Sequence, residues 1–271
     1  MNPKAGPVAS LVKLVLSLLY GVPLLWIVLT SFKSSSDVIK TQASVVFTPT
    51  LDAYRNSLDG ALAQALGQSA LIAVGTTALT LLVAVPAAYG LARTSGWLPS
   101  LGLGLLIVLQ MMPQTANVIP LFQIFGGWHL LDTTLGVVLA DSALLIPFAT
   151  LLLRPFFRVV PPQLEEAASI DGANLLRTFW SVALPVARNG LFTVGTLIFL
   201  LAWGEFLYAV NFFLAPDHYP LSALLAQQVS AFGIDWPGLM ALAVLTSIPI
   251  LVVFSSTYRL LRDGLTVGAV K

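Results

Sequence analysis

Residues Leu164 to Pro185, LEEAASIDGANLLRTFWSVALP, form a polar, helix-forming segment between two long apolar runs. Apolar runs of roughly 20 residues are long enough to cross a bilayer as helices. A polar segment between two such runs is expected outside the hydrocarbon layer, where other proteins can reach it. The stretch therefore predicts a docking element on a membrane protein.

The composition of the whole chain supports a membrane location. Hydrophobic residues make up 57% of it and charged residues only 9%, and the mean hydropathy is +0.90, whereas soluble domains carry about 25% charged residues. Six windows qualify as spans: Leu14–Phe32, Ser69–Ala92, Leu101–Phe125, Leu135–Leu153, Leu191–Phe213 and Leu239–Tyr258. Helices satisfy their own backbone in lipid, and the runs lack the alternation of a membrane β-barrel. We expect an all-α, polytopic membrane protein, with residues 1–271 in one domain.

The basic residues predict how the chain is oriented. No small-residue cleavage site follows the first apolar run in SFKSSSD, residues 31–37, so the run is expected to be retained as a span. With six spans, ten basic residues fall on one side and only Lys33, Lys40 and Arg55 on the other. The ten are Lys4, Lys13, Arg93, Arg154, Arg158, Arg177, Arg188, Arg259, Arg262 and Lys271. The excess places both termini in the cytoplasm.

The opening stretch predicts a helix, a turn and a second helix. Pro162 can open a helix, and acids such as Glu165 are favoured in its first turn by the helix dipole. Asp171 and Gly172 are expected to end it, because glycine readily takes the left-handed conformation of a sharp turn. The second helix, Ala173–Ala183, has one apolar face that carries Leu176, Phe179, Trp180 and Ala183. From the residues alone, an interfacial hairpin without a partner is the alternative.

The string EEAASIDGA, with Phe179 and Leu184-Pro185 after it, resembles the EAA loop of bacterial ABC importer permeases. In that family the first helix of the loop is a coupling helix that docks in a groove of a cytoplasmic ATPase. The resemblance implies the type I ABC importer permease fold, with a coupling loop at residues 154–190. It carries the ATPase-coupling role to Glu165, Glu166, Ala167, Ala168, Asp171, Gly172 and Ala173. Asn189 stands where the family often has a second proline. The resemblance therefore does not predict the local backbone bend that this proline would give.

Motifs elsewhere in the chain resemble the carbohydrate-uptake branch of this family. They are AAYGLAR at 87–93, Pro113 with Ile119-Pro120-Leu121, LLDTTLG at 130–136, Pro147-Phe148 and the tail GLTVGAVK at 264–271. The tail is similar to that of the maltose-transporter G-subunit type, in which it reaches the ATPase interface. The resemblance thus implies ATPase contacts for Thr266, Gly268, Val270 and Lys271. Without the resemblance, a frayed end is the expectation for terminal residues.

The resemblance also implies partners and a cargo. Expected partners are a second permease like that of the maltose transporter, a homodimer or pair of ABC ATPases, an extracytoplasmic sugar-binding protein and membrane lipid. ATP and Mg²⁺ would be used by the ATPase, with no cofactor on this chain, and the cargo would be a maltose- or trehalose-like oligosaccharide. The protein would lie in a bacterial or archaeal cell (inner) membrane. A net charge of +1 gives no indication of nucleic-acid binding.

Outer-loop aromatic residues are candidates for the binding-protein contact. The stretch Asp217–Trp236 carries Tyr219, Phe232 and Trp236, and aromatic side chains are common interface anchors. Alternatively, these aromatic residues belong to the belt at the membrane–water interface, and the sequence favours neither interpretation.

Two carboxylates, Asp141 and Glu205, fall within predicted spans. A charge at the centre of a span costs roughly 2.5–3.5 kcal/mol, so each should face protein or water. We expect a translocation path lined by Trp203, Glu205, Tyr208, Asn211 and Asp141, because rings and polar groups together suit sugars. A hydrogen bond to a neighbouring helix or to the partner permease is the alternative. The third span is also polar, with Gln110, Gln114, Asn117 and Gln123.

The sequence offers no catalytic motif. It contains no cysteine, and its two histidines, His129 and His218, show no metal-site spacing with carboxylates. No Gly-rich loop ends in Gly-Lys-Ser/Thr, so we expect a non-catalytic subunit. The alternatives are an ABC importer permease for another small solute, an ion-coupled secondary transporter and an intramembrane enzyme, the last two using the membrane carboxylates.

Overall fold

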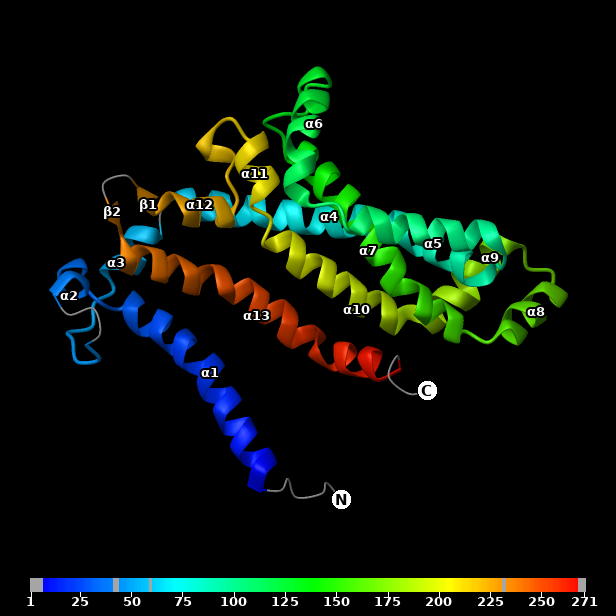
Figure 1. The fold of residues 1–271 in the computed structure, drawn as a ribbon, viewed down its shortest axis with the longest axis horizontal. Helices are drawn as coiled ribbons and strands as arrows, with labels where there is room; N and C mark the ends of the chain where they lie inside the picture. Colours follow the sequence, from blue (N-terminus) through cyan, green and yellow to red (C-terminus); the bar gives the residue numbers. More distant parts are fainter. Residues whose placement is uncertain (1–6, 41–43, 59, 231–232, 268–271) are drawn as a thin grey trace. The chain divides into compact units, whose positions relative to one another are not determined.

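The long apolar runs of the sequence form helices in the computed structural model of the chain (Figure 1). The structure describes residues 7–40, 44–58, 60–230 and 233–267. Within those residues the only strands are β1 (Val229–Ser230) and β2 (Gly233–Ile234), which pair as a short antiparallel ladder. The predicted all-α fold class is confirmed.

Five of the described helical stretches are long and apolar enough to cross a bilayer. They are α1 (Pro7–Ser31), α4 (Gly60–Arg93), α7 (Thr134–Val159), the stretch Leu175–Trp203 and α13 (Trp236–Val267). Each overlaps a predicted window and begins before it. Shorter helices lie in the connections: α2 (Ser35–Lys40), α3 (Asp52–Ser57), η2 (Pro216–His218) and α12 (Leu221–Gln227).

The third predicted span is broken. It consists of α5 (Trp97–Gln110) and α6 (Gln114–Gly127), whose axes are bent by 92°. Pro113 stands at the break with an extended backbone, because it lacks an N–H and disfavours a helical residue before it. The predicted window Leu101–Phe125 therefore covers two helices joined at a sharp bend. The described helices make six spans only if this bent pair counts as one.

The fifth predicted span begins and ends earlier than expected. Its helix runs through α9 (Leu175–Thr178), the π-helical turn η1 (Phe179–Ala183) and α10 (Leu184–Trp203). The chain then leaves the helix at Gly204 and forms a separate helix, α11 (Leu207–Phe212). The predicted window 191–213 therefore joined two helices, because hydropathy does not register a break between apolar segments.

The chain divides into two compact units. The first contains residues 1–63 and 224–248, and the second contains residues 64–223 and 249–271. In the first unit, the end of α1 is tied to the following segment: the Thr50 amide donates to the Phe32 carbonyl at 2.8 Å, and Ser31 hydrogen-bonds the Tyr54 hydroxyl. Lys33 is buried beside them, with its ammonium 4.7 Å from the centre of the Trp26 ring. The single permease domain remains a prediction.

The second unit has two apolar clusters, one toward each end of α7. One joins α4, α7, η1 and α10 around three rings, Tyr89, Phe157 and Phe179, whose centroids lie 5.1–6.4 Å apart. The other contains Ile72, Phe125, Val137, Ala140, Tyr208, Ala209, Phe212 and Phe213. These clusters position the polar groups described below.

Candidate functional site

The predicted helix, turn and helix is present in the structure. The first helix is α8 (Pro162–Ile170), with proline at its first position. Gly172 follows with φ of +82°, its amide donating to the Ser169 carbonyl at 3.0 Å, and the Ala173 amide donates to the Ala168 carbonyl at 2.9 Å. This pair of hydrogen bonds is the Schellman ending of a helix. We call residues 162–178, from α8 through α9, the α8–α9 hairpin.

The second helix starts later than predicted and presents a different face. Asn174 caps α9 by accepting a hydrogen bond from the Arg177 amide at 2.9 Å. Phe179 is buried, but Leu176 and Trp180, predicted on the same face, are exposed. Ala183, also predicted on that face, is buried.

The hairpin leaves apolar side chains uncovered within this chain. Ile170, at the end of α8, is 86% exposed, and Leu175, Leu176 and Trp180 are also exposed. Leu176 and Trp180 help to line an apolar groove of about 660 Å³ between α4 and the α9–α10 stretch. Exposed apolar surface of this kind marks a contact with protein or lipid.

The two adjacent glutamates of the hairpin have different surroundings. The Glu165 carboxylate accepts hydrogen bonds from Arg93 Nε at 2.9 and 3.0 Å, from Arg93 Nη2 at 2.6 Å and from the Tyr89 hydroxyl at 3.1 Å. Both partners belong to α4, so the ion pair joins residues 72 positions apart. Glu166 is exposed. The sequence motif does not distinguish the two acids. In the structure, Glu165 pairs with Arg93 within the chain and Glu166 is exposed.

The structure brings some of the predicted path residues together. Glu205 is 7% exposed, and its carboxylate accepts hydrogen bonds from Gln114 Nε2 at 2.9 Å and from the Tyr208 amide. Tyr208 is 1% exposed, and Asp141 is also buried. Gln114, from the polar third span, thus belongs to this cluster.

The arrangement of Asn211 differs from the expectation. Asn211 is exposed and donates to the Leu207 carbonyl at 2.7 Å, whereas Tyr208 on the same short helix is buried. Trp203 is buried at the end of α10, with its ring centroid 5.7 Å from that of Phe199. Of the predicted lining residues, Asn211 is thus the exposed one within this chain, while Trp203, Glu205, Tyr208 and Asp141 are buried.

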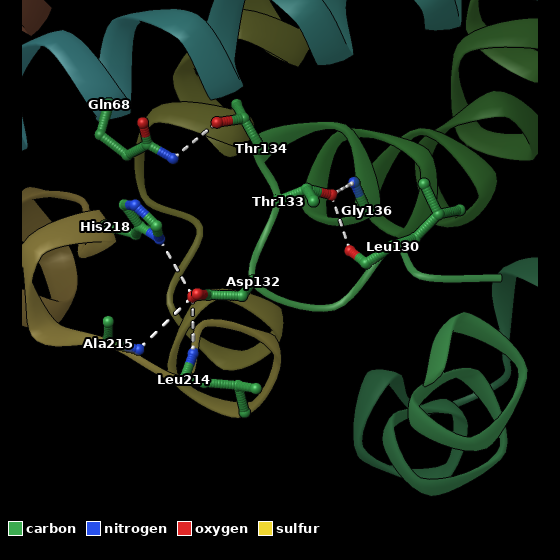
Figure 2. A network of polar contacts seen from close by, with 9 residues as sticks. All are labelled: Gln68, Leu130, Asp132, Thr133, Thr134, Gly136, Leu214, Ala215 and His218. Atoms are coloured by element: carbon green, nitrogen blue, oxygen red, sulfur yellow. Dashed lines mark hydrogen bonds and ion pairs between the residues drawn. The ribbon is translucent and has the colours of Figure 1, made fainter. Parts of the chain in front are cut away.

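Sequence reasoning missed a polar network at the opposite end of α7 from α8 (Figure 2). Asp132 has φ of +58°, and its Oδ1 accepts from the Leu214 and Ala215 amides at 2.9 and 3.4 Å. The same oxygen lies 3.0 Å from His218 Nδ1, and the Asp132 amide donates to the Phe212 carbonyl at 2.8 Å. The hydrogen bond from His218, and next the one from Leu214, hold the pKa of Asp132 below its ordinary 3.8.

The residues after Asp132 continue this network into α7. The Thr133 hydroxyl caps that helix by accepting from the Gly136 amide at 3.1 Å, and Gln68 Nε2 donates to the Thr134 hydroxyl at 2.9 Å (Figure 2). The only signal in the sequence was the Asp-Thr-Thr string before an apolar run, which is typical of a helix start. Its partners lie more than 80 residues later.

Other predicted sites are tested less fully by the structure. Thr266 belongs to the last turn of α13, while Gly268, Val270 and Lys271 lie outside the described residues, as does Phe232. In the part of the chain that the structure describes, no three His, Asp or Glu side chains gather as a metal site requires.

Comparisons with known proteins agree with this architecture. Residues 80–267 match the family described as "Binding-protein-dependent transport system inner membrane component". The chain is 33% identical over 251 residues to the sulfoquinovosyl glycerol transport system permease protein SmoH of Agrobacterium fabrum, covering 92% of this chain and 88% of that protein. It is also 33% identical over 253 residues to the trehalose transport system permease protein SugB of Mycobacterium tuberculosis, covering 92% of both.

The fold is similar to that of a solved ABC transporter. A chain from the crystal structure of a bacterial ABC transporter involved in the import of the acidic polysaccharide alginate matches with a TM-score of 0.78 and 21% identity. The match covers 95% of this chain and 99% of that one. Because the family match spans more than half of the sequence, the chain belongs to the binding-protein-dependent transport system inner membrane components, the permeases of ABC importers.

Proposed function

We propose that the chain is one of two permease subunits of a carbohydrate ABC importer, of the maltose-transporter G-subunit type. The observation that carries the proposal is the α8–α9 hairpin, a capped polar helix with an exposed surface between two apolar spans. The relatives named for sulfoquinovosyl glycerol and trehalose support a sugar or sugar derivative as cargo. A maltose- or trehalose-like oligosaccharide is the cargo that we infer.

The hairpin would dock on an ABC ATPase through α8. The residues that we assign to this contact are Glu166, Ala167, Ala168, Asp171, Gly172 and Ala173, with Glu165 as their anchor within the chain. Small side chains such as Ala167 allow a partner surface to approach closely. ATP and Mg²⁺ would be bound and used by the ATPase, so closure of the ATPase pair would move α8 and turn the bundle between inward-open and outward-open states.

This docking sets the orientation that we propose for the chain in a bacterial or archaeal cell membrane. ATP is cytoplasmic, so the hairpin faces the cytoplasm, and both termini lie on the same side as the excess of basic residues. The Asp132 network then faces outward, toward a sugar-binding protein. In the first unit, Trp236, Ile234 and Ile39 help to line a hollow of about 320 Å³ that supports this contact.

The translocation path would be shared with the second permease. We retain Trp203, Glu205, Tyr208, Asn211 and Asp141 as candidate path residues, with Glu205 in a different role. Its carboxylate is occupied by Gln114 and by the Tyr208 amide, which supports holding the path in shape rather than binding sugar directly.

The test is to purify the tagged chain from its native membranes in mild detergent and to identify the proteins that accompany it. We expect an ABC ATPase and a second permease, and ATP hydrolysis that rises with the cognate sugar and its binding protein. In reconstituted vesicles, uptake should require ATP and persist when ionophores collapse the ion gradients. Uptake that needs the gradient and ignores ATP would instead identify an ion-coupled transporter, and stimulation only by a non-sugar solute would overturn the carbohydrate assignment.

A further inference from the structure

We propose that Arg93 and Tyr89 on α4 are positioning residues for ATPase coupling: they clamp Glu165, so that α8 moves together with α4 and, of the two glutamates, only Glu166 is available to the ATPase. This inference rests on the proposed function and adds a division of roles between the two glutamates. Below, the clamp means Tyr89, Arg93 and Glu165.

The geometry of the clamp suits the transmission of force. Arg93 engages both carboxylate oxygens of Glu165, and such charge-assisted, two-point pairs fix orientation as well as distance. The side chains are only 21% and 15% exposed, so water weakens the pair less than it weakens a surface ion pair. The Tyr89 hydroxyl adds a third donor on the second oxygen.

The clamp is itself held by α7. Arg93 Nη2 also donates to the Val160 carbonyl at 3.1 Å, directly after the end of that helix. Arg154, on α7, donates from Nε to the Leu91 carbonyl of α4 at 3.0 Å. The ends of α4 and α7 are thus cross-linked, and α8 is attached to both.

The packing around Tyr89 ties the clamp to η1, directly after the hairpin. Its ring lies 5.1 Å from that of Phe179 and 5.6 Å from that of Phe157, measured between centroids. A displacement of α8 therefore meets side chains of α4, α7 and η1 at one place. Besides the clamp, α8 contacts α9 and η1 directly, and its two ends join the bundle through the extended backbone at Val160 and Pro161 and through the turn at Gly172.

Glu166 lacks this surrounding. It is one residue further along α8, about 100° around the helix, and it is exposed, whereas the Glu165 side chain is only 15% exposed. The same chemical change at the two positions therefore has different expected effects. Removing the Glu165 charge loosens α8 from α4, whereas removing the Glu166 charge weakens the contact with the ATPase.

The experiment uses the complete transporter in proteoliposomes and measures sugar imported per ATP hydrolysed, together with the amount of ATPase that co-purifies. We expect Glu165→Gln and Arg93→Gln to lower the ratio of sugar to ATP by about fivefold or more, with the ATPase still co-purifying. Tyr89→Phe, which keeps the ring packing, should give a smaller loss. Glu166→Gln is the matched control and should instead reduce co-purification.

The charge-swapped pair Arg93→Glu with Glu165→Arg separates clamping from simple misfolding. The double variant should import more sugar per ATP than either charge reversal, Arg93→Glu or Glu165→Arg, does alone. An unchanged ratio in Glu165→Gln would overturn the clamp, as would loss of ATPase co-purification equal to that of Glu166→Gln. Absence of ATP-dependent uptake by the unmodified complex would overturn the proposed function itself, and the clamp's role with it.

Discussion

Gly172 shows how a single residue shapes the proposed docking element. Its φ of +82° lies in the left-handed region, and no atom lies within 4 Å of the position that a Cβ would take. The requirement for glycine therefore comes from the backbone conformation and not from lack of space. The turn it allows ends α8 with two hydrogen bonds to the helix carbonyls.

Gly172→Val should uncouple transport. A β-branched residue in this conformation costs about 1–3 kcal/mol, enough to favour a different turn and to misplace α8. We expect membrane insertion to stay normal while sugar uptake by the reconstituted transporter falls. Gly172→Asn is the control, because asparagine tolerates the left-handed region, and it should retain most of the uptake. Normal uptake by the valine variant would contradict the role of the turn.

The lowered pKa of Asp132 predicts that its loop responds to pH. Its pKa is lowered in the fold, so its charged form is preferred by the native state. The stabilisation is therefore present above its ordinary value of 3.8 and is lost as the pH falls through the lower folded pKa. We expect hydrogen exchange at the Leu214 amide, corrected for its intrinsic rate, to lose protection over that acidic range.

Asp132→Asn provides the control for this titration. Asparagine keeps an oxygen that can accept from the amides but does not titrate. The protection of Leu214 in this variant should be weaker at neutral pH and nearly independent of pH. Equal pH dependence in both proteins would show that another group controls the loop.

At the scale of helices, the breaks within spans matter more than their lengths. Pro113 separates α5 from α6, and the break after Trp203 frees α11, so that Gln114 and Tyr208 both reach the carboxylate of Glu205. In an uninterrupted helix the Tyr208 amide would donate to the Gly204 carbonyl and not to the Glu205 side chain. The buried polar cluster is thus a product of the two breaks.

The contact between α7 and α10 depends on a glycine. A Cβ at Gly190 would overlap the ring of Phe156, and overpacking of this kind costs about 1–3 kcal/mol. We expect Gly190→Ala to lower the Tm of the purified protein in detergent. Gly67→Ala is the control, because nothing lies within 4 Å of that position and alanine favours helix. A second substitution, Phe156→Leu, should restore part of the Tm, and no loss with Gly190→Ala would contradict this packing.

At the scale of the whole molecule, we propose that the partner ATPases move the helix bundle of this chain between its two states. The two clusters of the second unit lie toward opposite ends of α7, one beside the clamp and one beside the Asp132 network. Because α7 is one helix from Thr134 to Val159, it is a rigid element that connects these two packed ends.

Deletion of Leu265 to Lys271 tests the predicted ATPase contact of the tail. The resemblance of the tail to the maltose-transporter G-subunit type predicts that its loss reduces sugar-stimulated ATP hydrolysis more than assembly of the complex. The comparison is between the ATPase rate and the amount of ATPase that co-purifies, with the full-length chain as reference. Normal stimulation in the truncated transporter would identify the tail as an end without a role.

The sequence alone was sufficient for the class of fold and for the α8–α9 hairpin. Long apolar runs predict spanning helices, because backbone groups must be satisfied locally in lipid. The acids, the prolines and Gly172 predict helix ends through short-range geometry. These signals lie within a few residues of the structure that they specify, so a linear reading finds them.

Only the tertiary structure decided which polar groups meet. Arg93 pairs with Glu165 across 72 positions, Gln114 with Glu205 across 91, and Asp132 with His218 across 86. It also gives Glu165 and Glu166 different surroundings, although the motif does not distinguish them. Such pairings depend on how helices pack and where they break. Hydropathy and local propensity carry no information about either, because both are summed along the chain and not across it.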